Sequence, residues 1–180
     1  KKIFDIKLKL ERPALLVLED QYDVDPTYFV YGGLLFAPLS RDYLKSWGHE
    51  WFKSAPNELI TIYETKIRTP ERQEVIILQK VLADRVNQGY HEYENHVVAS
   101  VNGTQVANMR HLVTLIESDT GPFITIGLED GQRITLDRQK AHERGAVILD
   151  RYNLRFDRSK DLRQASSKSR AKKKPRPAKA

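Results

Sequence analysis

A double glycine inside an aromatic, apolar segment constrains the fold of this chain more than any other feature of its sequence. Residues 28–39 read Tyr-Phe-Val-Tyr-Gly-Gly-Leu-Leu-Phe-Ala-Pro-Leu. Aromatic and branched aliphatic residues favour extended strands, whereas two consecutive glycines permit the positive φ angles of a sharp turn. The segment therefore predicts a strand, a tight backbone turn at Gly32-Gly33 and a second strand.

Other apolar patterns predict further short strands and several helices. The predicted strands, besides the two around the glycines, are 2–10, 75–78, 97–101, 124–128 and 134–136. Asn102-Gly103 and Asp130-Gly131 are turn signals, and the first is typical of a two-residue hairpin. No repeating strand–helix–strand pattern is present, so a doubly wound parallel sheet is not expected.

Three regions have helical patterns. The stretch 40–73 reads as a helical insertion, with Ser40 as a first cap, Pro56 in a later first turn and Thr69-Pro70 as its end. Residues 109–116 place apolar side chains at i, i+3, i+4 and i+7 behind a capping Asn108. A last helix is predicted over 138–152.

Composition excludes several classes of protein. The 180 residues are 40% hydrophobic, which is enough for one ordinary domain core and short extras. No apolar run approaches the roughly 20 residues that span a bilayer, so we expect no membrane span. The chain has no cysteine, which excludes a disulfide framework, a thiolate zinc site and a cysteine nucleophile.

The positive charge is concentrated at the C-terminal end. The net charge of the whole chain is +6. Residues 158–180 have a net charge of +9, so residues 1–157 have a net charge of −3. The last part has no aromatic residue after position 157 and few apolar ones, which predicts a disordered tail. Two roles remain open for it, a solubilising tail and a site of weak nonspecific attraction to nucleic acid or anionic lipid.

No self-contained active site is recognisable in the sequence. His91 and His96 lie five positions apart, whereas two zinc ligands on one helical face need a spacing of four. The acidic cluster 19–25 lacks the central glycine and final glutamate of a calcium loop. Serine-nucleophile motifs and phosphate-binding glycine loops are absent as well. We therefore expect no catalytic residue, no metal site and no cofactor.

The glycine turn is the strongest candidate for a binding site. Consecutive backbone N–H groups at such a turn can hold a peptide carboxylate, the following strand can accept the peptide, and the helix over 109–116 supplies the other wall. A plain β-turn beside a core helix remains the alternative. The candidate peptide-binding residues are Tyr31, Gly32, Gly33, Leu34, Leu35, Phe36, Met109, Leu112 and Val113.

Several segments, in this order, resemble one known family. They are 28–36 with Pro38-Leu39 and Tyr43-Leu44, then 81–84, 87–90, 98–106, and Asn108, Met109, His111 and Leu112. Together they are similar to the second, atypical PDZ domain of Deg/HtrA-type serine proteases, in the branch with plant organellar and bacterial members. Residues 2–10 resemble the last strand of a preceding PDZ domain, so the resemblance covers about 1–155.

The resemblance implies a PDZ-like, partly open β-barrel with flanking helices. It also implies polypeptide segments or C-termini as partners, together with upstream protease and PDZ domains of the same chain. In many PDZ domains the carboxylate loop reads Gly-Leu-Gly-Phe, and Leu35 replaces its second glycine here. The catalytic His, Asp and Ser of such families precede their PDZ domains, so catalysis is implied only for a parent protein. The residues themselves indicate no compartment, and the resemblance favours the bacterial periplasm or envelope for that parent protein.

These observations predict four regions and leave two functions open. The regions are the trailing strand of a preceding domain (1–12), a linker (13–26), a PDZ-like domain (27–155) and a disordered basic tail (156–180), and we expect them to end a longer protein. One function is a regulatory module that binds polypeptides for proteolysis. The other is a structural domain with an occluded groove that mediates homo-oligomer contacts, as aromatic Trp47, Trp51 and Phe52 in the insertion suggest.

Overall fold

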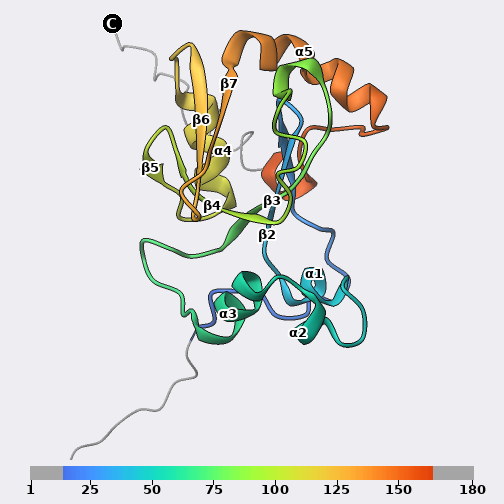
Figure 1. Cartoon of the computed structure of the whole chain (residues 1–180), viewed down its shortest axis with the longest axis vertical. Coiled ribbons are helices and arrows are strands. Elements are labelled where there is room, and N and C mark those ends of the chain that lie inside the picture. The colour runs from blue at the N-terminus through green and yellow to red at the C-terminus, as the bar shows by residue number, and fades with distance from the viewer. Residues whose placement is uncertain (1–13, 164–180) are drawn as a thin grey trace, which may run out of the picture.

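An antiparallel sheet organises residues 14–163, the part of the chain that the computed structural model describes (Figure 1). The strands are β1 (Phe29–Tyr31), β2 (Leu34–Pro38), β3 (Ile76–Val81), β4 (His96–Val101), β5 (Thr104–Gln105), β6 (Phe123–Leu128) and β7 (Arg133–Asp137). Their order is β1-β2-β3-β4-β6-β7, with β5 paired to β4. The helices are α1 (Arg41–Lys45), α2 (Trp51–Ser54), α3 (Asn57–Thr65), α4 (Met109–Ser118) and α5 (Arg138–Arg151), with a 3-10 turn at Arg85–Asn87.

The predicted mixture of helices and antiparallel strands is confirmed. Asn102 and Gly103 have φ angles of 48° and 81°, as the two-residue hairpin between β4 and β5 requires. Within the described residues β1 and β7 stand at the two ends of the strand order, so a closed barrel is not shown. The expected strand over 2–10 lies outside the described residues.

The main core lies between the sheet and α4. The four apolar positions predicted for this helix are all buried: Met109, Leu112, Val113 and Ile116. Asn108 caps the helix, because its side-chain oxygen accepts a hydrogen bond from the backbone N–H of His111 at 2.8 Å. Phe29, Phe36 and Leu34 from the glycine segment join the same core.

A second core on the other side of β3 explains why that strand is continuously apolar. Ile76 and Leu78 face the main core, whereas Ile77 packs with the helical insertion α1–α3. Leu16 and Val17, from the stretch expected to be a linker, are buried in this second core too. In Figure 1 the insertion lies at the end of the molecule opposite α5.

The insertion differs from the sequence prediction at its end. The helix α3 stops at Thr65, before the predicted Thr69-Pro70, and it buries Leu59 and Ile62. Ile67 is 58% exposed because it lies beyond the helix, in an isolated antiparallel bridge to Leu15.

The end of the described chain packs on the domain. The C-terminal segment (residues 156–163) was placed at the start of the basic tail, yet the structure buries Ser159 and Leu162. The difference arises because the backbone of the segment pairs with β1, a partner about 130 positions away that local composition cannot reveal. Across the described residues no helix has the length and apolarity needed to cross a membrane.

Candidate peptide-binding site

The double glycine forms the predicted tight turn between two strands. Gly32 and Gly33 have φ angles of 55° and 86°, a conformation that residues with a Cβ atom rarely adopt. Tyr31 and Leu34 face each other directly on either side, so the turn is a two-residue hairpin.

This hairpin covers the strand edge that was expected to accept a peptide. One edge of β2 pairs with β3, and the other edge pairs antiparallel with β1, from Tyr31 opposite Leu34 to Phe29 opposite Phe36. A peptide added to β2 would need the position that β1 occupies. The chain itself therefore supplies the strand beside β2.

Side chains of β1 fill the space on both faces of the hairpin. The Phe29 ring stacks on the rings of Tyr31 and Phe36, each with centroids 6.5 Å apart, and points into the main core. Val30 points the other way, into a small cluster with Leu82 and Ile148 beneath α5. Burial raises the pKa of the Tyr31 hydroxyl, which has no hydrogen-bond partner among the described residues.

The candidate residues are brought together, mostly as core residues. Leu34, Phe36, Met109 and Leu112 are at most 2% exposed, and Val113 is 8% exposed. Leu35 is partly buried and packs with the cluster beneath α5. These side chains belong to the same buried clusters as Phe29 and Val30 of β1.

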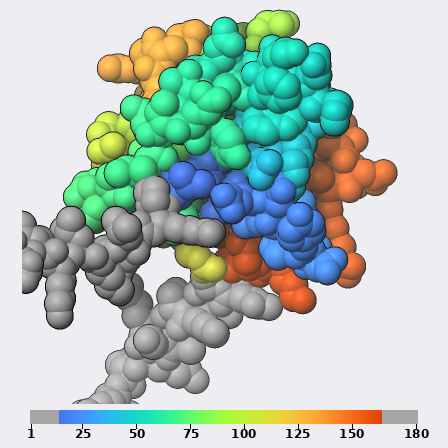
Figure 2. All heavy atoms as spheres, turned by 90° about the horizontal axis from the view of Figure 1, so that it is seen from below, coloured from blue at the N-terminus to red at the C-terminus, as the bar shows by residue number. Residues whose placement is uncertain are grey.

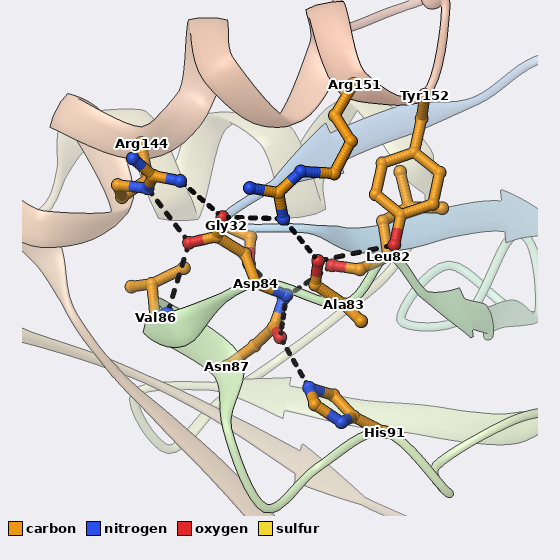
Figure 3. Close-up of polar contacts among 10 residues, drawn as sticks. All are labelled: Gly32, Leu82, Ala83, Asp84, Val86, Asn87, His91, Arg144, Arg151 and Tyr152. Carbon is orange, nitrogen blue, oxygen red and sulfur yellow. Dashed lines mark hydrogen bonds and ion pairs between the residues drawn. The ribbon is translucent and has the colours of Figure 1, made fainter.

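The glycine turn itself is buried, which corrects the expectation that its N–H groups are exposed to a ligand. The side-chain amide of Asn87 donates to the carbonyl oxygens of Gly32 at 2.9 Å and Leu82 at 2.8 Å (Figure 3). The backbone N–H of Leu82 donates to the carbonyl oxygen of Gly33 at 2.7 Å. A Cβ atom on Gly33 would collide with both Asn87 and Leu82.

An ion-pair network that sequence reasoning missed fixes α5 beside this turn. The carboxylate of Asp84 accepts from Arg144 at 3.0 and 2.7 Å and lies 3.1 Å from Arg151 (Figure 3). The hydrogen bonds from Arg144 lower the pKa of Asp84 to about 2, although burial opposes that change. One local signal points to this turn: Asp84 lies three residues before Asn87, which is the spacing of a capping box, and the two side chains form one.

The outer edge of β1 is covered as well. The backbone N–H of Val30 donates to the carbonyl oxygen of Asp157 at 2.7 Å, and that of Ser159 donates to Tyr28 at 3.0 Å. Phe29 and Arg158 form an antiparallel bridge between these bonds. Residues 156–163 carry no local pattern that indicates this contact, because their composition matches that of the basic tail.

No metal-binding cluster of three or more His, Cys, Asp or Glu residues occurs within residues 14–163. His91 lies 3.2 Å from the side-chain oxygen of Asn87, whereas His96 pairs with Asp130 at 2.9 Å. The two histidines thus have separate protein partners.

Comparison with known proteins places these features in a family. Residues 17–161 match the model of a PDZ domain. The chain is 30% identical over 171 residues to "Putative protease Do-like 3, mitochondrial" of Arabidopsis thaliana, covering 95% of this chain and 29% of that protein. It is 32% identical over 151 residues to "Protease Do-like 4, mitochondrial" of the same plant, covering 84% and 26%.

A relative from another organism shows the same relation. The chain is 30% identical over 117 residues to the "Serine protease DegP homolog" of Plasmodium falciparum, covering 65% of this chain and 13% of that protein. The chain spans less than a third of the length of each of these curated relatives. It belongs to the PDZ domain family and is homologous, over most of its length, to the protease Do-like proteins of the Deg/HtrA type.

Proposed function

We propose that this chain is a non-catalytic PDZ region of a Deg/HtrA-type serine protease whose peptide groove is filled by its own chain in the resting form. Two observations carry the proposal together: β1 pairs with the edge of β2 that β3 leaves free, and residues 157–159 cover the outer edge of β1. Strand addition needs a free row of backbone groups, and β2 is paired along both edges. The resting region then serves the protease as a structural domain.

Contacts between copies are the second half of this proposal. The insertion carries a cluster of rings in which Trp51 meets Phe52 and Tyr63 edge-on, with centroids 6.1 and 5.5 Å apart. Phe52 is 52% exposed. Figure 2 shows that the insertion and residues 14–26 lie side by side on one face of the molecule. Trp51 and Tyr63 are partly buried against the second core, and the exposed ring of Phe52 suits an oligomer interface.

A peptide titration tests the closed groove. A fluorescent library of peptides with random C-termini is added to the intact chain, and each is compared with its amidated counterpart. We expect no saturable binding at micromolar concentrations. Micromolar binding that is lost when the peptide carboxylate is blocked would favour the polypeptide-binding function instead.

Sedimentation tests the contacts between copies. We expect the chain to form a defined oligomer in analytical ultracentrifugation, and Phe52→Ser to weaken it. Val147→Ser is the matched control, because Val147 is 42% exposed on α5, away from the insertion. A chain that remains monomeric at 100-fold higher concentrations than those used in the titration would contradict the interface.

A further inference from the structure

The C-terminal segment (residues 156–163) contacts β1 in the way an added peptide strand would. It runs antiparallel to β1, and its two backbone hydrogen bonds join Asp157 to Val30 and Ser159 to Tyr28 at 2.7 and 3.0 Å. The hydroxyl of Ser159 also accepts from the backbone N–H of Tyr28 at 3.2 Å. A main-chain ladder of this kind is how strand-adding sites hold extended peptides, whatever the sequence of the peptide.

Two side chains of the segment give the contact its specificity. The Arg158 guanidinium lies 2.7 Å from the carboxylate of Glu117 on α4 and 4.9 Å from the centre of the Phe29 ring. Four residues later, Leu162 is 5% exposed and belongs to the main core. Other contacts lie at the surface, such as the 3.1 Å hydrogen bond from Thr27 to Asp161. Besides the backbone hydrogen bonds, one ion pair to α4 and one apolar anchor therefore hold the segment, and Arg158 also pairs with Asp157 of the segment itself at 2.7 Å.

The groove beside β1 is longer than the segment that lies in it. A hollow of about 1470 Å³ extends along β1 to Tyr31 and the C-terminal part of α4, and Asp157 and Arg158 form part of its wall. Phe123, on its rim, is 55% exposed. The space can hold a chain that continues past the position of Asp157.

We propose that β1 and α4 form an exchangeable docking groove for a polypeptide segment that pairs with β1 beside an arginine and, four residues later, places a leucine on a helical turn, as residues 160–163 do. The C-terminal segment is its resident occupant. This inference rests on the proposed function, since it concerns what opens a groove that is closed at rest. Glu117 selects the arginine by charge, the core selects the leucine, and β1 supplies the hydrogen bonds.

The test supplies the segment in trans. The probe is a labelled peptide with the sequence of residues 156–164, and its binding to the full-length chain is followed by fluorescence anisotropy. The variant Leu162→Asp removes the apolar anchor and should raise the affinity for the peptide at least tenfold over the unaltered chain. Lys160→Asp is the matched control, because Lys160 is exposed in the same segment and should leave the affinity unchanged.

A charge exchange keeps the test informative even where Leu162→Asp disturbs folding. Glu117 is 50% exposed, so Glu117→Arg should fold normally and, by repelling Arg158, should also release the segment. This variant should bind a peptide carrying Arg158→Glu at least tenfold more tightly than the original peptide. Equal affinity for the two peptides, or no binding by either folded variant, would overturn the docking groove.

Two further outcomes separate the alternatives. Dimers that form in Leu162→Asp without added peptide would assign the groove to a second copy of the chain and overturn the proposal of a separate polypeptide. Carboxylate-dependent peptide binding by the unaltered chain would overturn the proposed function itself. If the variants fail to bind the peptide, the library titration of the unaltered chain still gives its own result. Failure of the docking groove is therefore distinguishable from failure of the proposed function.

Discussion

The side-chain amide of Asn87 donates a hydrogen bond to the carbonyl oxygen of Gly32, 55 positions earlier in the chain, at 2.9 Å. The same amide bonds Leu82, and the Asn87 side-chain oxygen accepts from the backbone N–H of Asp84 at 2.9 Å. Asn87 is fully buried. One side chain therefore joins the glycine turn, the end of β3 and the ion pairs of α5.

Replacing this side chain should destabilise the fold. Asn87→Ala leaves two buried carbonyl groups without their donor, and each such loss costs about 1–3 kcal/mol. We expect the free energy of unfolding in urea to fall by about 3 kcal/mol. Gln88→Ala, at the next and exposed position, should change it by less than about 0.5 kcal/mol. Equal effects of the two variants would show that the hydrogen bonds of Asn87 contribute nothing.

Alanine substitutions at Gly33 and Gly131 distinguish the cost of backbone strain from the cost of steric overlap. Their φ angles are 86° and 87°, yet a Cβ atom would collide with Asn87 and Leu82 at Gly33 and would meet nothing within 4 Å at Gly131. Gly131→Ala should cost about 1 kcal/mol from strain alone. Gly33→Ala adds overpacking and should cost about 2–5 kcal/mol in total. Thermal unfolding of both variants measures the difference, and similar melting temperatures would contradict the buried turn.

Local sequence signals predicted the turn, the hairpin and the helix of this site. Pairing between residues far apart in the sequence determines whether the site is open or closed. The glycine turn, the Asn102-Gly103 hairpin and the apolar face of α4 follow from residues within a few positions of one another. The closure of the groove depends on Val30 meeting Asp157, and the burial of the turn depends on Asn87 meeting Gly32. Such partners share no local pattern, so the sequence suggested an exposed turn where the structure has a buried one.

Asp84 should make stability depend on pH in the acid range. Its pKa is about 2 in the folded chain, below the ordinary 3.8, so the charged form stabilises the fold. This contribution, about 2 kcal/mol, is present above pH about 4 and is lost as the pH falls towards 2. Its side chain is only 1% exposed, so solvent screens the ion pair little.

Urea unfolding of the unaltered chain and of Asp84→Asn measures this effect. The difference in unfolding free energy should be about 2 kcal/mol at pH 7 and should shrink towards pH 2. Asp150→Asn, at an exposed position of α5, should show no comparable difference. A gap between the unaltered chain and Asp84→Asn that is constant from pH 7 to pH 2 would mean that the charge of Asp84 is not its source.

The helix α4 should behave as a core element rather than as a free groove wall. Leu112 is fully buried, so Leu112→Ala should lower the free energy of unfolding by about 2–5 kcal/mol through lost contacts and a cavity. Thr114→Ala, at an exposed position of the same helix, should change it little. A cost below about 1 kcal/mol for Leu112→Ala would place the helix outside the core.

Hydrogen exchange at the amide of Val30 tests the closed groove most directly. This N–H points outward from β1 and its bond to the carbonyl oxygen of Asp157, at 2.7 Å, exists only while the C-terminal segment covers the strand. Measured by NMR on the full chain, the amide should exchange as slowly as those of the central strand β3, which open only with large-scale unfolding. Exchange at the rate of an unprotected amide, while β3 stays protected, would contradict the closed groove.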